Sequence, residues 1–205
     1  MGFPIYKAII NPDMASDVEV NFIALVDKPA IERNFLAFNE QRQKLHFAIN
    51  EEKRIISGPA MVADMPIYRN DDVMGEYYVV FDAPAIQAIV QKFSAKGFMN
   101  NFNLFHNDND IVKGVTIFNS FISNKELGIQ PLEGFNDCAD GSWFISAKVD
   151  NDDVWQQVKT GELKGFSVEG LFNYIPLQMQ GKPKYTLEQA EAMIQRILSE
   201  TDFGE

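Results

Sequence analysis

The chain has 205 residues, of which 46% are hydrophobic and 23% charged, as expected for one globular domain rather than a disordered chain. Its net charge of −11 argues against a nucleic-acid-binding protein, because such proteins carry basic patches. The single cysteine, Cys138, excludes an intrachain disulfide and favours a reducing compartment. The sequence shows neither an apolar run of ~18 residues nor a signal-peptide pattern, so we expect no membrane association.

Hydrophobic alternation and turn residues divide the chain into short strands and a few helices. The patterns predict strands at residues 17–27, 54–63 (with a break at Gly58-Pro59), 77–81, 112–122, 142–149 and 164–174. Residues 32–50 fit a helix and a loop equally well. Two helices are expected between these strands, one from Asp82 to Gly97 and a shorter one between Asp150 and Gly161. After a linker that is rich in Pro, Gly and Gln, Thr186 begins an amphipathic C-terminal helix.

Ser167 is the candidate nucleophile, because a glycine lies close to it on either side within an apolar run that alternates like a strand. Serine needs a base to take its proton, and the chain offers only two histidines, His46 and His106. His46 fits an ordinary surface or half-buried position. His106 shares strand parity with Phe102 and Leu104 and precedes a polar turn, Asn107–Asp110. On these residues alone, a serine and a histidine 61 positions apart are a weak signal.

Other chemistries find less support in the sequence. The spacing around Ser167 is G-x-S-x-x-G, not the G-x-S-x-G of α/β-hydrolases, and no glycine-rich phosphate loop is present. One cysteine and two histidines make no zinc set, and Val112 stands where a calcium loop after Asn107 needs an oxygen ligand. Cys138 lies among acidic residues, which raise a thiol pKa rather than lower it. We therefore expect no cofactor and no metal.

Four segments resemble the phage prohead proteases, which mature the capsid, and especially the group of serine proteases found in Bacillus prophages. They are NFIALVDKPAI at 21–31, GPAMVADMPIYR at 58–69 followed by EYYVVF at 76–81, LFHNDNDIVKGVTIFNSFI at 104–122, and the segment 140–170 that ends in KGFSVEG. The third looks like the histidine motif of that family, and the fourth runs strand, short helix and serine strand in the family order. The similarity covers most of residues 17–174.

The resemblance implies a fold like that of herpesvirus assemblin. In fold class this is α+β, with a mainly antiparallel, β-barrel-like core surrounded by helices. The LVD-x-PA segment lies at the N-terminus here, which indicates a circular permutation of the family order. Residues 1–174 would form the protease domain, and residues 175–205 a linker and the amphipathic helix.

The same resemblance implies a serine endopeptidase, with Ser167 as nucleophile and His106 as general base. The position of the third, acidic member is held by Phe22, so either another residue supplies the acid or the mechanism needs only the serine–histidine dyad and a backbone acceptor. We expect Glu19 in this role, with Asp27 and Glu169 as alternatives.

As a prohead protease, the protein would act in the cytoplasm of the bacterial host, inside the assembling prohead. Its partners would be the scaffold protein and the major capsid protein, and it would cleave both and itself; self-association stays open. The alternative is a non-catalytic capsid-assembly or scaffold-associated protein that keeps the protease fold. A distance of ~2.6–3.5 Å between Ser167 Oγ and His106 would favour the enzyme.

Overall fold

The computed structural model describes residues 3–176, except residues 12, 15, 17–18, 28–45 and 47. Within this part of the chain, 44% of the residues lie in strands and 17% in helices. The helices are α1 (Ala83–Ala95), the short 3₁₀ helix η2 (Phe98–Asn100) and α2 (Asp152–Thr160). The strands are β1 (Ile5–Ile9), β2 (Val20–Val26), β3 (Ala48–Asn50), β4 (Ile55–Met61), β5 (Ile67–Asp71), β6 (Gly75–Val80), β7 (Phe102–Leu104), β8 (Asn107–Val112), β9 (Val115–Ile122), β10 (Trp143–Val149), β11 (Gly165–Gly170) and β12 (Asn173–Pro176).

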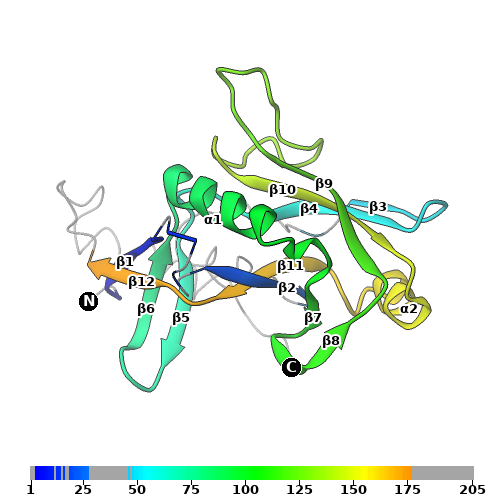
Figure 1. The fold of residues 1–205 in the computed structure, drawn as a ribbon, viewed down its shortest axis with the longest axis horizontal. Helices are drawn as coiled ribbons and strands as arrows, with labels where there is room; N and C mark the ends of the chain where they lie inside the picture. The colour runs from blue at the N-terminus through cyan, green and yellow to red at the C-terminus, as the bar shows by residue number, and fades with distance from the viewer. Residues whose placement is uncertain are drawn as a thin grey trace, which may run out of the picture.

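The described strands form three four-stranded sheets, with the orders β12-β1-β6-β5, β3-β4-β10-β9 and β11-β2-β7-β8 (Figure 1). The expected fold class, a β-barrel-like core surrounded by helices, is therefore wrong: the described sheets close no barrel, and two α-helices cannot surround them. The sheets differ from the expected barrel because of how the strands pair. Parallel pairs, β1 with β6 and β2 with β7, join strands far apart in sequence into separate sheets, and local hydrophobic pattern does not determine which strands pair.

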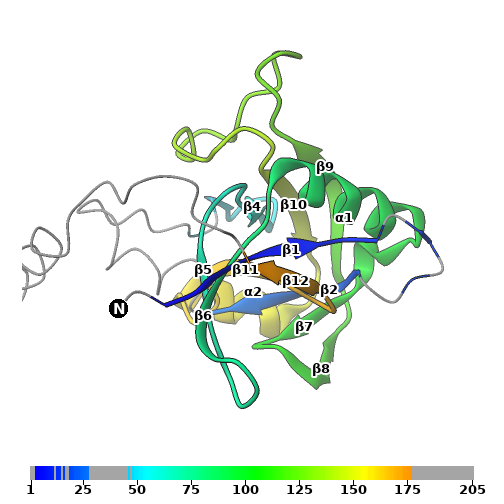
Figure 2. The ribbon, with the colours of Figure 1, turned by 90° about the vertical axis from the view of Figure 1, so that its left-hand side faces the viewer.

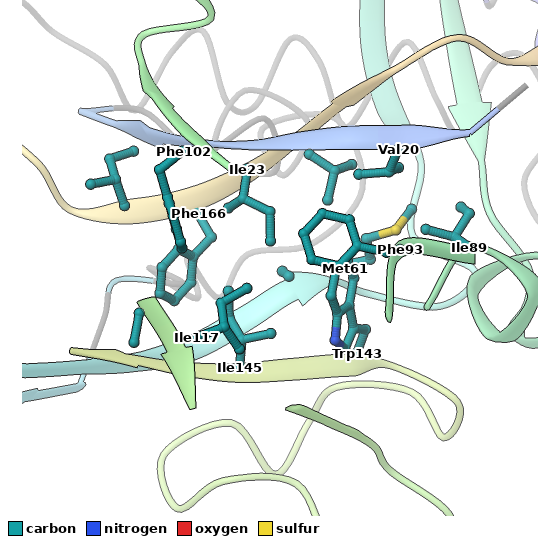
Figure 3. Packing of buried hydrophobic residues seen from close by; sticks show 14 of the residues in the cluster. Val20, Ile23, Met61, Ile89, Phe93, Phe102, Ile117, Trp143, Ile145 and Phe166 are labelled. Carbon is teal, nitrogen blue, oxygen red and sulfur yellow. The ribbon is translucent and has the colours of Figure 1, made fainter. Parts of the chain in front are cut away.

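The main hydrophobic core lies between the sheet that contains β2 and β11 and the sheet that contains β4 and β10 (Figure 3). Ile23 and Phe166 come from the first sheet, and Trp143 and Ile145 from the second, where alternate residues of β10 point inward as predicted. Helix α1 adds Phe93, whose ring meets that of Trp143 edge-on with 5.3 Å between the ring centroids. This packing gives β11 a fixed position.

Helices α1 and α2 were both predicted, and their ends follow from local capping interactions. The Asp82 carboxylate accepts a hydrogen bond from the backbone N–H of Ala85 (3.0 Å) at the start of α1, and Gly97 takes the left-handed conformation (φ +74°) after its end. Helix α2 ends at Thr160 with Gly161 as its C-cap, as expected, but its N-cap is Asn151 rather than Asp150. None of the described helices is long and apolar enough to cross a membrane.

The six predicted strands correspond to β2, β4, β6, β9, β10 and β11 with local differences, and the other six described strands were not predicted as strands. Strand β4 runs through Gly58-Pro59 without the predicted break, although the register of its pairing with β10 shifts between Trp143 and Phe144. The polar segment 107–110 is not a turn but the first part of β8. Strand β12 extends to Pro176, two residues past the expected domain boundary, and pairs with β1 (Figure 2). The C-terminal helix predicted from Thr186 lies outside the described residues, as does most of 32–50.

Candidate active site

Ser167 lies on β11, an edge strand of its sheet. Its neighbours Phe166 and Val168 point into the core, so the Ser167 hydroxyl points to the opposite face of the sheet. The side chain is nevertheless only 4% exposed. A hydroxyl on a rigid, buried strand is held in one place, which is what a nucleophile needs.

The register of the sheet aligns three residues across three strands. Ser167 of β11 pairs with Ala24 of β2, and Ala24 pairs with Asn103 of β7. Paired residues share one face of a sheet, so Ser167 and Asn103 flank the short methyl group of Ala24. Glu169, two residues along β11, lies on the same face, opposite Phe22.

His106 occupies a two-residue turn between β7 and β8, where Leu104 pairs with Asn107. Phe105 and His106 both have positive φ, 52° and 60°, a conformation that two-residue hairpin turns require and that non-glycine residues seldom adopt. The Phe105 N–H donates to the Leu25 carbonyl of β2 (3.1 Å), which fixes the turn beside the Ser167 sheet. The strand parity expected of His106 is therefore wrong, and the turn is what places the imidazole over the serine.

The histidine bridges the serine and a carboxylate. His106 Nε2 lies 3.0 Å from Ser167 Oγ, and His106 Nδ1 lies 3.3 Å from Glu169 Oε2. With a proton on Nδ1 directed at Glu169, the imidazole presents the lone pair of Nε2 to the serine hydroxyl. The His106 side chain is 40% exposed and that of Glu169 26%, so the site opens to solvent on the histidine side.

Asn103 is a member of this cluster that the sequence reasoning missed. Its side chain is fully buried, and Nδ2 donates a hydrogen bond of 2.6 Å to the same Glu169 oxygen, Oε2, that faces the imidazole. Asn103 Oδ1 is buried and accepts no hydrogen bond within the described part of the chain. The available signal was weak: a polar residue that alternates with Phe102 and Leu104 just before the histidine.

The other two acidic candidates lie elsewhere. Glu19 faces α1, where Oε2 pairs with Lys96 and lies 3.7 Å from the Nζ of the buried Lys92. Asp27 is exposed and follows the last residue of β2. Glu169 is opposite Phe22, near the first residue of β2, so the two acids lie toward opposite ends of that strand. Of the three carboxylates proposed from the sequence, the structure brings Glu169 to the serine–histidine pair.

Two further residues singled out in the sequence lie away from this cluster. His46 precedes β3, in a different sheet from Ser167. Cys138 is buried in a second, smaller hydrophobic cluster, and burial, followed by the charge of Asp137, raises the pKa of its thiol to about 11. In the described residues, no group of three or more His, Cys, Asp or Glu side chains is placed to hold a metal ion.

A pocket adjoins the serine at the edge of β11. It is lined by Ala60, Met61, Val62, Ile67, Arg69, Phe81, Phe166, Ser167 and Val168. These residues come from β11, from the end of β4 and the residue after it, from β5, and from the residue that follows β6. All are apolar except Ser167 and Arg69.

Comparison with known proteins identifies one family. The model of the family described as "Putative phage serine protease XkdF" matches residues 44–175, which is more than half of the chain and includes His106, Ser167 and Glu169. No curated protein and no solved structure shows significant similarity to the chain.

Proposed function

The chain belongs to this family of phage serine proteases, and we propose that it is a serine endopeptidase that processes scaffold and capsid proteins as the prohead matures. The observation that carries the proposal is the contact of 3.0 Å between Ser167 Oγ and His106 Nε2, with Glu169 at the other ring nitrogen. Such a chain of serine, imidazole and carboxylate is the arrangement that makes a serine hydroxyl nucleophilic.

In the proposed reaction, Ser167 Oγ attacks the carbonyl carbon of the peptide bond while His106 Nε2 takes the hydroxyl proton. The imidazolium then gives that proton to the leaving amine, the C–N bond breaks, and an acyl-enzyme ester remains on Ser167. Water attacks this ester with His106 again as base. The ester bond breaks, Ser167 regains its proton and the carboxylic acid product leaves.

Glu169 supports each proton transfer without giving up a proton itself. Its Oε2 faces His106 Nδ1, so the carboxylate holds the ring in the productive tautomer and stabilises the imidazolium. Asn103 donates to the same oxygen at 2.6 Å and thereby fixes the direction of the carboxylate. We assign Asn103 as a positioning residue, because it acts through Glu169 and not on the substrate.

The proposed substrates are the scaffold protein, the major capsid protein and the protease itself, all inside the assembling prohead in the host cytoplasm. The family assignment supports a phage role, and the proposal extends it to these partners. The net charge of −11 is consistent with a protein that must stay soluble when it is concentrated in a shell.

Co-expression with the scaffold and capsid proteins of the same phage tests the proposal. Intact-mass spectrometry would compare wild type with Ser167→Ala and with the control Ser94→Ala, which changes an exposed serine of α1. We expect defined fragments with wild type and Ser94→Ala and none with Ser167→Ala. Uncleaved partners that co-assemble equally well with all three proteins would contradict the proposal and favour the non-catalytic assembly protein.

A further inference from the structure

We propose that the pocket beside Ser167 receives the side chain of the residue whose carbonyl is attacked, and that Arg69 makes this pocket selective for a carboxylate. The inference rests on the proposed protease function and adds its substrate class, which is peptides cleaved after glutamate or aspartate. Three features of the described residues support it: the place of the pocket, the state of Arg69 and the apolar lining around it.

The pocket lies between two sheet edges. Strand β11 ends the order β11-β2-β7-β8, and β5 ends the order β12-β1-β6-β5. Both strands contribute to the lining, β11 through Phe166–Val168 and β5 through Ile67 and Arg69, which are two residues apart and share one face of the strand. An edge strand can pair with an extended peptide through its free backbone groups. A peptide bound in this way beside Ser167 has its nearest side chain at the pocket.

Arg69 is a half-buried cation that has no anionic partner among the side chains that the structure describes. The printed sequence has 29 acidic residues, yet no ion pair joins Arg69 to any acid whose side chain the structure describes, which leaves Asp71, Asp108 and Asp110 aside. The one side-chain hydrogen bond of Arg69 within the described ranges is a long one, 3.4 Å from Nη1 to the carbonyl oxygen of neighbouring Tyr68. Half-buried guanidinium groups are normally paired, and the planar fork of arginine matches a carboxylate in two-point hydrogen bonding.

The rest of the lining strengthens the preference. Met61, Val62, Ile67 and Phe81 are all buried apolar residues, so no acid among the lining residues competes with a substrate carboxylate. A charge pair in such surroundings is stronger than the same pair in water. A lysine or arginine side chain in this pocket would instead face the Arg69 cation, so the pocket discriminates by repulsion as well as by attraction.

Cleavage-site profiling tests the preference. Wild type, Arg69→Gln and the control Arg54→Gln would each be incubated with a tryptic peptide library, and the new termini would be read by mass spectrometry. Arg54 is a matched control because its partner is Asp152 at the start of α2, not a residue of the pocket. We expect cleavage after Glu and Asp with wild type and Arg54→Gln, and a loss of the preference for Glu over Gln of about tenfold or more with Arg69→Gln. Cleavage without acidic preference, or an unchanged preference in Arg69→Gln, overturns the inference while the protease function stands.

If no cleavage is seen, a binding measurement tests the acid-selective pocket separately from the protease function. Ser167→Ala protein would be titrated with two fluorescein-labelled hexapeptide pools that differ only in Glu or Gln at the fourth position. We expect the Glu pool to bind about tenfold more tightly than the Gln pool, and this difference to disappear when Arg69→Gln is added to Ser167→Ala. That result supports a carboxylate-selective pocket even if the protease function fails. Equal binding of the two pools overturns the pocket inference.

Discussion

The carboxylate of Glu169 has two neighbours at one oxygen, the imidazole of His106 and the amide of Asn103. The sequence singled out Ser167 and His106 as candidates, because only two histidines are present and one of them falls in the segment that resembles a protease motif. It did not select Glu169 over Glu19. That choice depends on strand register and on the two lysines near Glu19, Lys92 of α1 and Lys96 just after that helix, and neither feature is visible in local pattern.

Exchanging each acid for its amide distinguishes the two candidates. We expect Glu169→Gln to lower kcat by roughly 10²- to 10⁴-fold, because an amide cannot stabilise the imidazolium and favours the wrong tautomer. Glu19→Gln should leave kcat unchanged and lower the free energy of unfolding by about 2 kcal/mol, because the buried Lys92 loses its anionic neighbour. Peptide hydrolysis and urea unfolding measure the two effects. The reverse result, a large loss of kcat only in Glu19→Gln, would contradict the assignment.

Asn103 should affect catalysis through the direction of the Glu169 carboxylate. We expect Asn103→Ala to lower kcat by about tenfold with little change in KM, because the amide contacts Glu169 and not the substrate. The kcat and KM values would be measured on protein shown to be folded by circular dichroism. A rise in KM with an unchanged kcat would place Asn103 in substrate binding instead.

Cys138 should be an unreactive thiol. Its pKa is raised from 9.0 to about 11, first by burial and then by Asp137, so at a given pH the folded protein holds less thiolate than the unfolded chain. At pH 7.5 we expect iodoacetamide to label the folded protein about 100-fold more slowly than the urea-unfolded protein, with a rate that rises about tenfold per pH unit below pH 11. Equal labelling rates, or loss of hydrolysis in Cys138→Ser, would count against this account.

At the scale of elements, the two placements that matter most are the His106 turn and helix α1. The sequence predicted α1 almost to its ends, because an aspartate cap, a proline in the first turn and a terminal glycine are local signals. It did not predict the hairpin turn, since Phe105 and His106 are not the residues that such turns favour. The residue preference of hairpin turns is therefore broken at His106, a residue proposed to be catalytic, and functional sites are where such departures are expected.

Helix α1 is tied to the N-terminal segment through Lys92. This buried ammonium donates to the backbone carbonyls of Asn11 (3.2 Å), Asp13 (2.9 Å) and Ser16 (3.0 Å). We expect Lys92→Met to lower the free energy of unfolding by about 3 kcal/mol, because these carbonyls lose their donor and Glu19 loses a cation. Urea denaturation measures the loss. Lys159→Met, at an exposed position in the last turn of α2, is the control and should change stability by less than ~0.5 kcal/mol. A similar effect of both substitutions would refute this role of Lys92.

At the scale of the whole molecule, three sheets meet so that the proposed nucleophile lies at an edge next to the edge of another sheet. The sequence predicted six of the twelve described strands and the inward face of β10, because these follow from alternation. The assembly into three open sheets, and with it the pocket and the place of Arg69, could not be predicted. These depend on pairing between strands as distant in sequence as β2 and β11 or β1 and β12.

Covalent labelling of Ser167 is the decisive experiment for the proposed catalytic site. Wild type, Ser167→Ala and His106→Ala would be treated with a fluorophosphonate, which forms a bond to an activated serine oxygen and releases fluoride. We expect one adduct per wild-type chain, located at Ser167 by peptide mapping, none in Ser167→Ala, and labelling at least 100-fold slower in His106→Ala. No adduct on the wild-type protein, or an adduct that survives in Ser167→Ala, would contradict the proposed catalytic site.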